Sequence, residues 1–437
     1  MEHWALTAYS VLATIVLVHA ALMLIHTWEN RRFARGRMRA LGVGARRRGK
    51  AAIIAPCKGL DVGFEDNLRA LFQQDYRNYE LVFVVESPLD PACAVIRRVI
   101  AEHTRLRARI VFAGRAAHSG QKVHNLQAAT AAISADVTYL AFVDGDARPR
   151  RQWLRSLVDR LSDPKVGAVT GYRWFVPEGD TWANWAVYSI NCGVALLLGH
   201  GRRFLVWGGS WAMRRRVFEA LDVRARWEGT LSDDLVVTRV LRQHGLQVQF
   251  EPACMIASPL DMNVREALAF LQRQYQVGRF YARGYWLLGL VSASVVNAFL
   301  LLTMWLAAAG WIGGRPWTSA VLGAAAAYYV LSVLRCWVRQ DLVSVYFPYL
   351  AKRMGPARRF DLWAAPLAGM FNWLGLMRSL FRRRIVWRGI DYWLDSDGRV
   401  RAVGEAVGDG PDIIPIASGA RQAQEEVPNW SDRRKAG

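Results

Sequence analysis

The chain has 437 residues, 53% of them hydrophobic, and a formal net charge of +21. This apolar content and the 19 tryptophans are unusual for a soluble enzyme and indicate contact with a membrane. The positive charge comes mostly from arginines that stand beside apolar segments, which disfavours a nucleic-acid-binding protein. The five cysteines are odd in number and form no C-x-x-C pair, so they predict reduced cytosolic thiols, not metal ligands or disulfides.

The first apolar segment runs from Trp4 to Ile25 and is long enough to cross a bilayer. Arginines follow it at positions 31, 32, 35, 37, 39 and 46–48. Because positive flanks stay in the cytoplasm, residues 1–29 are predicted to be an anchor with its N-terminus outside. Residues 30–50 would then form a basic cytoplasmic linker.

Strands and helical stretches alternate in the next part of the chain. Strands are expected at 51–56, 80–85, 108–112 and 138–143, and helices at 64–74 and 92–104. This alternation predicts parallel βαβ units, and therefore an α/β domain with a doubly wound, mostly parallel sheet.

The expected strand at 138–143 ends in Asp144-Gly145-Asp146. Residues two apart point to the same face of a strand, so the two carboxylates could converge on one cation. Two carboxylates combined with phosphate oxygens suit Mg²⁺ or Mn²⁺. Taken alone, the same three residues fit a simple turn at a strand end at least as well.

A second acidic pair opens an expected helix. Ser232 has the chemistry of an N-cap, and Asp233 and Asp234 follow it in the first turn. The helix dipole favours an ionised carboxylate there, which is the state that a general base needs. Acids that stabilise the dipole without any chemistry are the alternative.

Several motifs occur together in an order that resembles family-2 glycosyltransferases, most closely the ceramide glucosyltransferase branch. They are Pro56-x-Lys58-Gly59, Gln74-Asp75-Tyr76, Asp90-Pro91-Ala92, Lys122-x-x-Asn125-Leu126 and Asp144-x-Asp146. The resemblance implies a glycosyltransferase A fold and a nucleotide-sugar donor, normally a UDP-sugar. It also implies a donor site made of Pro56, Lys58, Glu86, Lys122 and Asp144. Asp144 and Asp146 would hold the metal, and Asp234 aligns with the catalytic base.

For two of the residues expected in the donor site, a second interpretation remains open. Family members often have an acidic residue where this chain has Ser87, so Glu86 either serves the uridine instead or is a solvated charge. Lys122 stands between Gly120 and a helix, which favours phosphate contact over an ordinary surface lysine.

Two further segments resemble family motifs near the acceptor and the diphosphate. The first is Trp207–Arg214 with Gly209, which also fits a turn between packed aromatic residues, and residues 172–179 are expected to be a loop near the acceptor. The second, Gln276 to Phe280, resembles the Q/R-x-x-R-W signature with Phe280 in place of tryptophan. Arg279 suits a diphosphate, although a helix with surface arginines is the alternative. Five residues are therefore assigned to the acceptor or the diphosphate: Gly209, Asp233, Gln276, Arg279 and Phe280.

The α/β domain is expected to span 51–285, in the cytoplasm. A transmembrane hairpin then follows at 286–335, turning at Gly313–Pro316. Residues 336–402 form an amphipathic or re-entrant region, because basic residues flank the apolar segment 362–381 on both sides. The stretch Trp387–Tyr392 resembles the W-R-G-x-x-Y ending of membrane family-2 enzymes, and residues 403–437 are expected to be a disordered tail.

Together these features predict a membrane-bound inverting glycosyltransferase at the cytoplasmic face of a bacterial inner membrane. It would transfer a hexose, in the first instance from UDP-glucose, to the hydroxyl of a ceramide-like or other membrane lipid. Its partners are a nucleotide-sugar donor, a lipid acceptor and the bilayer, with no nucleic acid. A processive polysaccharide synthase is the nearest alternative, and a non-catalytic basic membrane-binding protein is an alternative of another class.

Overall fold

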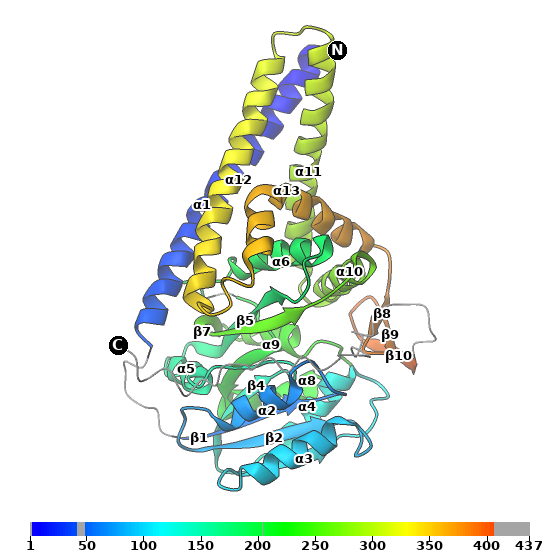
Figure 1. Cartoon of the computed structure of the whole chain (residues 1–437). Helices are drawn as coiled ribbons and strands as arrows, with labels where there is room; N and C mark the ends of the chain where they lie inside the picture. Colours follow the sequence, from blue (N-terminus) through cyan, green and yellow to red (C-terminus); the bar gives the residue numbers. More distant parts are fainter. Residues whose placement is uncertain (1, 42–48, 203, 406–437) are drawn as a thin grey trace, which may run out of the picture.

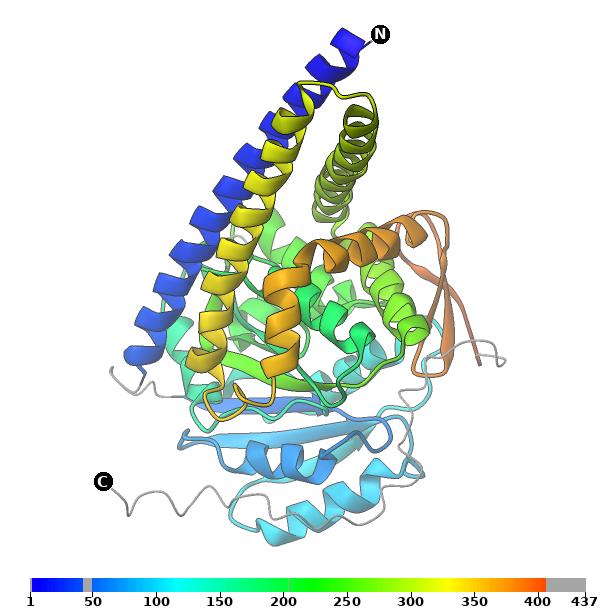
Figure 2. The same ribbon diagram turned by 45° about the horizontal axis from the view of Figure 1, so that its top comes forward.

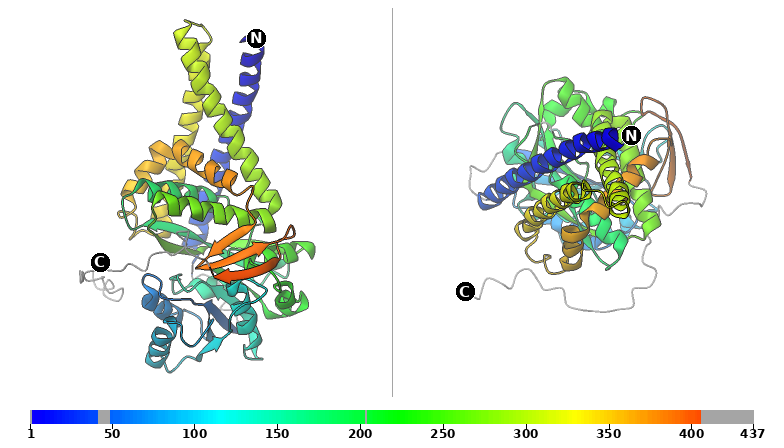
Figure 3. Two further views of the ribbon diagram at one scale, coloured as in Figure 1. Left: turned by 90° about the vertical axis from the view of Figure 1, so that its right-hand side faces the viewer. Right: turned by 90° about the horizontal axis from the view of Figure 1, so that it is seen from above.

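The computed structural model describes residues 2–41, 49–202 and 204–405. An α/β domain forms the lower part of the molecule in Figure 1, and three long helices rise together from it. Figure 3, from above, shows these helices gathered over the domain.

The helices, in chain order, are α1 (Glu2–Arg39), α2 (Phe64–Phe72), α3 (Ala92–Glu102), α4 (Gln121–Ala131), α5 (Trp153–Arg160), α6 (Trp182–Ala195), α7 (Arg215–Ala220), α8 (Val223–Arg226), α9 (Asp233–Gln243), α10 (Val264–Tyr281), α11 (Arg283–Ile312), α12 (Thr318–Tyr346) and α13 (Gly355–Arg378). The strands are β1 (Lys50–Pro56), β2 (Tyr79–Val85), β3 (Ala108–Phe112), β4 (Val137–Val143), β5 (Val166–Pro177), β6 (Ser210–Arg214), β7 (Gln247–Leu260), β8 (Arg384–Trp387), β9 (Ile390–Leu394) and β10 (Val400–Glu405).

The central sheet has seven strands in the order β3-β2-β1-β4-β6-β5-β7. Of these seven described strands, only β6 runs antiparallel to its neighbours. Strands β1 and β2 are buried along most of their length, as expected for parallel strands with both faces covered by other elements. The predicted α/β class is therefore confirmed. The expected loop at 172–179 is wrong, because β5 continues to Pro177 and pairs with β7 as far as Leu260.

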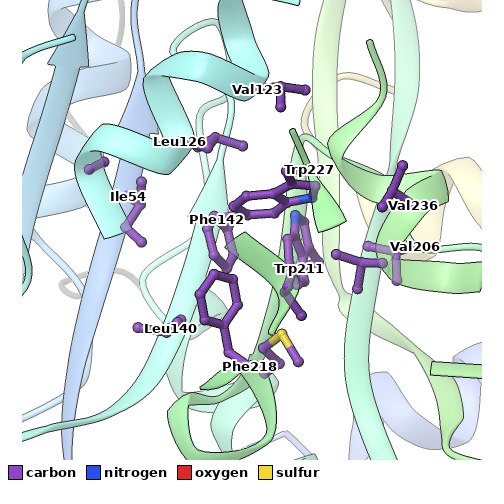
Figure 4. Packing of buried hydrophobic residues seen from close by; sticks show 14 of the residues in the cluster. Ile54, Val123, Leu126, Leu140, Phe142, Val206, Trp211, Phe218, Trp227 and Val236 are labelled. Atoms are coloured by element: carbon purple, nitrogen blue, oxygen red, sulfur yellow. The ribbon is translucent and has the colours of Figure 1, made fainter. Parts of the chain in front are cut away.

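Aromatic packing fixes the end of β4 that carries the acidic motif (Figure 4). Phe142 of β4 stacks on its cross-strand partner Trp211 of β6, with ring centroids 4.1 Å apart. Trp227 meets Phe142 edge-on, and its Nε1 donates to the backbone oxygen of Asp233 at 2.9 Å. One buried cluster therefore holds both the D-G-D strand end and the start of α9.

Helices α1, α11 and α12 are each long and apolar enough to cross a membrane. Exposed tryptophans mark two levels along them: Trp4 is 80% exposed near the start of α1, and Trp28 is 45% exposed about two thirds of the way along it. At 1.5 Å per residue these two lie about 36 Å apart along the helix axis, close to the thickness of a bilayer with its interfaces. Trp337 of α12 is 62% exposed near the level of Trp28. Tryptophans gather at membrane–water interfaces, so these rings indicate where the bilayer surfaces lie.

Two expected boundaries differ from the helices observed. Helix α1 continues to Arg39, well past residue 29, and Lys50 already belongs to β1, so much of the expected linker is regular structure. The rest of that linker, 42–48, lies outside the described residues. Helix α12 continues past 335 to Tyr346, because its second half packs against the domain and not against lipid.

Helix α13 lies across the base of the three long helices (Figure 2) and is not among the candidate spans. It kinks at Ala364, just before Pro366, as proline interrupts helical hydrogen bonding. One face exposes Trp363, Leu367 and Leu374, which suits a helix lying in a membrane interface. The interfacial placement of 362–381 therefore stays a prediction with structural support.

A small antiparallel sheet, β10-β9-β8, follows α13 and lies beside the α/β domain (Figure 3). The expected disordered tail begins inside this sheet, since β10 extends to Glu405. Residues 406–437 lie outside the described residues.

Candidate active site

A cavity of about 1530 Å³ opens where β1 and β4 end. Its lower part is lined by the predicted metal residues Asp144 and Asp146, and by Asp233 and Asp234 at the start of α9. Its upper part is lined by residues of α1, α11, α12 and α13. The acidic motifs and the membrane helices therefore share one continuous space.

Lys122, in the first turn of α4, is the cation at the centre of the acidic cluster. Its Nζ lies 2.7 Å from Asp144 Oδ1 and 3.4 Å from Asp233 Oδ1, and it donates to the backbone oxygen of Gly208 at 3.3 Å. Burial alone would lower the pKa of Lys122, but the surrounding carboxylates raise it above its usual value. The lysine is therefore held charged.

The two carboxylates of the D-G-D motif differ in their surroundings. Burial would raise the pKa of Asp144, but Lys122 reverses the effect and holds that pKa below its usual range. Burial and the neighbouring charges of Asp144 and Asp61 raise the pKa of Asp146 to about 6. Arg388 and Arg173 offset this rise only in part, and a divalent ion bound by both carboxylates would supply further positive charge. The residues present fit a Mg²⁺ or Mn²⁺ site completed by phosphate oxygens.

Glycines allow the backbone at 208–209 to approach this cluster closely. A Cβ on Gly208 would lie 2.8 Å from Lys122 Nζ, and one on Gly209 would lie 2.8 Å from Asp144 Oδ2. A side chain at either position would therefore displace the charged groups that line the site. The backbone itself takes part, since Asp144 N donates to Gly209 O at 3.3 Å.

The start of α9 has the predicted cap. Ser232 Oγ accepts from Leu235 N and donates to Asp234 Oδ1 at 2.6 Å. Asp234 Oδ1 also accepts from Leu235 N at 2.7 Å, and its Oδ2 accepts from Gly208 N at 2.8 Å. These bonds fix the orientation of the carboxylate, and lone pairs remain on its oxygens to accept a proton.

Asp233 is held quite differently from its neighbour. Its side chain is buried, and its Oδ2 has no hydrogen-bond partner among the described residues. Burial, opposed by Lys122 and reinforced by Asp234 and Asp144, raises the pKa of Asp233 to about 7. One acid of the pair is thus firmly oriented, and the pKa of the other is raised by burial.

Arg388 enters the same cavity from the turn between β8 and β9. Arg388 and Gly389 both have positive φ, +48° and +76°, as a two-residue hairpin turn requires. This conformation is unfavourable for arginine, and bonds to the lower domain hold the side chain in place. Its Nη1 donates to Lys58 O at 2.9 Å, and its Nη2 donates to both carboxylate oxygens of Asp61, at 3.1 and 3.2 Å.

A family model described as glycosyl transferase family 21 matches residues 11–400, which is most of the chain. The chain belongs to glycosyl transferase family 21. The predicted family resemblance and the predicted glycosyltransferase A fold are confirmed at this level.

Curated relatives of this family 21 chain match over short segments. Ceramide glucosyltransferase 1 of Caenorhabditis elegans is 33% identical over 78 residues, which is 18% of this chain and 17% of the relative. Ceramide glucosyltransferase of Komagataella phaffii is 37% identical over 59 residues, or 14% of this chain and 12% of the relative. The matches thus span less than a fifth of each relative's length.

Among solved structures, the mannosyltransferase PcManGT from Pyrobaculum calidifontis, in complex with GDP-Man and Mn²⁺, is similar with a TM-score of 0.45 at 18% identity. The similarity covers 80% of this chain and 99% of that one.

Most of the predicted site residues come together in the family 21 chain. The cavity is lined by Pro56, Lys58, Lys122, Asp144, Asp146, Gly209, Asp233 and Asp234. Glu86 is not one of the described residues that line the cavity. Its carboxylate lies 3.9 Å from Lys58 Nζ instead. Glu86 is therefore placed to position Lys58, and a direct contact with the nucleotide has no support in this geometry.

The predicted roles of Gln276, Arg279 and Phe280 do not fit the structure. Cavity-lining positions of α10 include 274, 275, 277, 278 and 282, so these three residues lie on the opposite face of the helix. Gln276 Nε2 donates to the backbone oxygens of Arg382 and Arg384, at 3.2 and 3.3 Å, and Arg279 Nη2 donates to that of Arg382 at 2.5 Å. Gln276 and Arg279 thereby hold the segment after α13 in place.

Two other arginines lie at the acidic end of the cavity, which Arg279 does not line. Arg388 and Arg173 both line the cavity, and both lower the pKa of Asp144. Arg173 also lies over the rings of Trp207 and Phe270, at 5.6 and 5.5 Å. The W-R-G-x-x-Y motif contained Arg388, but nothing in its spacing indicated that it would reach Lys58.

Proposed function

We propose that this family 21 protein transfers a hexose from a nucleotide sugar, UDP-glucose in the first instance, to the hydroxyl of a membrane lipid at the cytoplasmic face of a bacterial inner membrane. The observation that supports the proposal is the continuity of the cavity. The acidic donor end opens directly into a space between helices apolar enough to cross a membrane. A lipid can therefore lie with its chains among α1, α11 and α12 while its hydroxyl reaches Asp234.

Asp234 is the general base in this mechanism. Its two oxygens are oriented by Gly208 N, Leu235 N and Ser232 Oγ, so the carboxylate needs no rearrangement to accept the proton of the lipid hydroxyl. The hydroxyl oxygen then attacks the anomeric carbon from the side opposite the leaving nucleotide, which inverts that centre.

The leaving diphosphate gains negative charge as the bond to the sugar breaks. Lys122, Arg173 and Arg388 are among the cationic side chains that line the cavity and can balance this charge. A divalent ion held by Asp144 and Asp146 would supply additional Lewis-acid stabilisation of the diphosphate when bound.

Lipid mass spectrometry tests the proposal. Membranes that contain the protein are incubated with a panel of nucleotide sugars, and Asp234→Asn membranes serve as the matched control. One added hexose on a lipid, present with the wild type and lost with the variant, is the expected result. A ladder of added sugars would favour the processive synthase instead. No new lipid with any donor in the panel would leave the non-catalytic membrane-binding alternative.

A further inference from the structure

The part of the cavity between the membrane helices is not purely apolar. Its lining includes His19 of α1, Ser292 of α11, and Tyr328, Ser332 and Arg335 of α12. His19 Nε2 and Ser292 Oγ lie 3.3 Å apart, so these two side chains already satisfy each other in part. Arg335 is the member of this group that carries a permanent charge.

Arg335 has no ion pair among the described residues. Its Nε donates to Thr27 Oγ1 at 3.2 Å, and Thr27 Oγ1 in turn donates to Met23 O at 2.7 Å. These contacts leave the terminal nitrogens of the guanidinium available to the cavity, which Arg335 lines. Arginine cannot release its proton to escape burial, so the charge requires a partner.

Neighbouring acids are already committed to other groups. Asp361 accepts from Arg339 Nε at 2.7 Å, from Ser189 Oγ at 2.6 Å and from Gln340 Nε2 at 2.5 Å. Further along α12, Asp341 pairs with Arg31 at 2.6 Å and with Arg35 at 2.5 Å. Asp361 and Asp341 are thus both engaged by other arginines, and neither forms an ion pair with Arg335.

Arg335 lies at the level of the lipid headgroups. Thr27, to which it donates, is adjacent to Trp28, and Trp337 is two positions further along α12. Both tryptophans are exposed and mark the membrane interface nearer the α/β domain. A charged residue at this depth, turned into a cavity instead of toward lipid, is typically functional.

We infer that Arg335 binds the acidic group, phosphate or carboxylate, of a membrane lipid that lies in this cavity. The planar guanidinium can donate two parallel hydrogen bonds to either group, and the hydroxyls of Ser332 and Tyr328 line the same space. The acidic group belongs either to the acceptor itself, in which case the inference rests on the proposed function, or to a second lipid bound beside it.

Lipid binding to the purified full-length protein tests the site without any need for activity. Native mass spectrometry in a non-ionic detergent compares phosphatidylglycerol with diacylglycerol of the same acyl chains. Because hydrogen bonds to charged groups are the strong ones, wild type should prefer phosphatidylglycerol by about tenfold or more, and Arg335→Gln should lose that preference. Arg315→Gln, in the turn between α11 and α12, is the matched control and should behave as wild type.

Equal binding of phosphatidylglycerol by wild type and Arg335→Gln would overturn the inference, as would the absence of any preference in wild type. If Arg335→Gln is not monodisperse, Arg335→Lys replaces it. Lysine keeps the charge but cannot donate two parallel hydrogen bonds. The preference of Arg335→Lys for phosphatidylglycerol over diacylglycerol should therefore fall to about a third of the wild-type value. An unchanged preference in Arg335→Lys, combined with no thermal stabilisation of wild type by phosphatidylglycerol, would also reject the site.

Transfer kinetics then separate the two sources of the acidic group. A KM increase in Arg335→Gln confined to acidic acceptor lipids assigns the group to the acceptor. Loss of phosphatidylglycerol binding, with an unchanged KM for neutral and acidic acceptors alike, assigns it to a second lipid. If no lipid accepts sugar but phosphatidylglycerol binding still depends on Arg335, the proposed function fails and the acidic-lipid site stands.

Discussion

The two ends of the cavity carry opposite excess charge. At the lower end, Asp144, Asp233 and Asp234 surround Lys122. Burial, together with neighbouring carboxylates, raises the pKa values of Asp146 and Asp233. At the membrane end, Arg335 forms no ion pair with any described residue. A site with an excess of negative charge favours the binding of a cation, and a site with an excess of positive charge favours the binding of an anion. Each end therefore indicates the charge of the ligand it lacks.

A nearby ion pair shows what a purely structural arrangement looks like in this protein. Arg339 and Asp361 are both buried, pair with each other and hold α12 against α13, and Asp361 also accepts from Ser189 Oγ and Gln340 Nε2. Here the charge is balanced within the chain, so no ligand is implied. Arg335 lies one helical turn away and has no such ion pair among the described residues, so its charge implies a ligand.

Metal removal should have the largest effect, because it acts on the charge excess at the lower end. EDTA is expected to abolish sugar transfer, and Mg²⁺ or Mn²⁺ should restore it. Asp146→Ala should weaken donor binding in the presence of metal, since one of two carboxylates is lost. Transfer assays with and without chelator provide the measurement. Full activity in EDTA would show that Lys122, Arg173 and Arg388 suffice without a metal.

The raised pKa of Asp146 adds a pH dependence to metal binding. A metal ligand must be ionised, and the pKa of the free Asp146 carboxyl is about 6. Protonation therefore competes with the metal below about pH 6, and apparent metal affinity should fall by up to about tenfold per pH unit there. Calorimetric titration of Mn²⁺ at a series of pH values measures this, and a flat profile between pH 5 and about 7 would contradict it.

The second-largest effect should come from the acidic pair at the start of α9. Asp234→Asn keeps the shape of the side chain but cannot accept the proton of the lipid, so kcat should fall by about 10²–10⁴. Asp233→Asn should be milder, because the neutral amide resembles the protonated carboxyl that the raised pKa of Asp233 favours. The two variants are measured side by side, with UDP titration to check donor binding. If Asp233→Asn is the more damaging, the base has been assigned to the wrong carboxylate.

Local sequence signals predicted the acidic half of the site well. A β-branched and aromatic run before Asp144, and a serine before Asp233, mark the end of a strand and the start of a helix, and both features depend on neighbours in sequence. The position of Arg388 could not be predicted in this way, since its partner Lys58 lies 330 residues away in the chain. The side of α10 that meets the cavity could not be predicted either. Every side of the helix carries apolar or basic residues, so periodicity alone did not indicate which of them lines the cavity.

The smallest of these effects should distinguish the arginine that lines the cavity from the one that does not. Arg388→Gln removes a positive charge beside Asp144 and Asp146, so the KM for the nucleotide sugar should rise by about tenfold. Arg279→Gln should leave that KM nearly unchanged. Arg279 bonds to the backbone oxygens of Leu380 and Arg382, so its loss should instead lower the melting temperature of the protein.

Both glutamine variants have lost one guanidinium, which makes them matched controls for each other. Donor kinetics and thermal melting, measured on the same preparations, should change in opposite order for the two. A donor KM raised as much by Arg279→Gln as by Arg388→Gln would restore the diphosphate role that the Q-x-x-R-F motif suggested. It would also mean that α10 rotates when the donor binds, because in the structure described its cavity face carries Tyr275 and Gly278 while Arg279 points away.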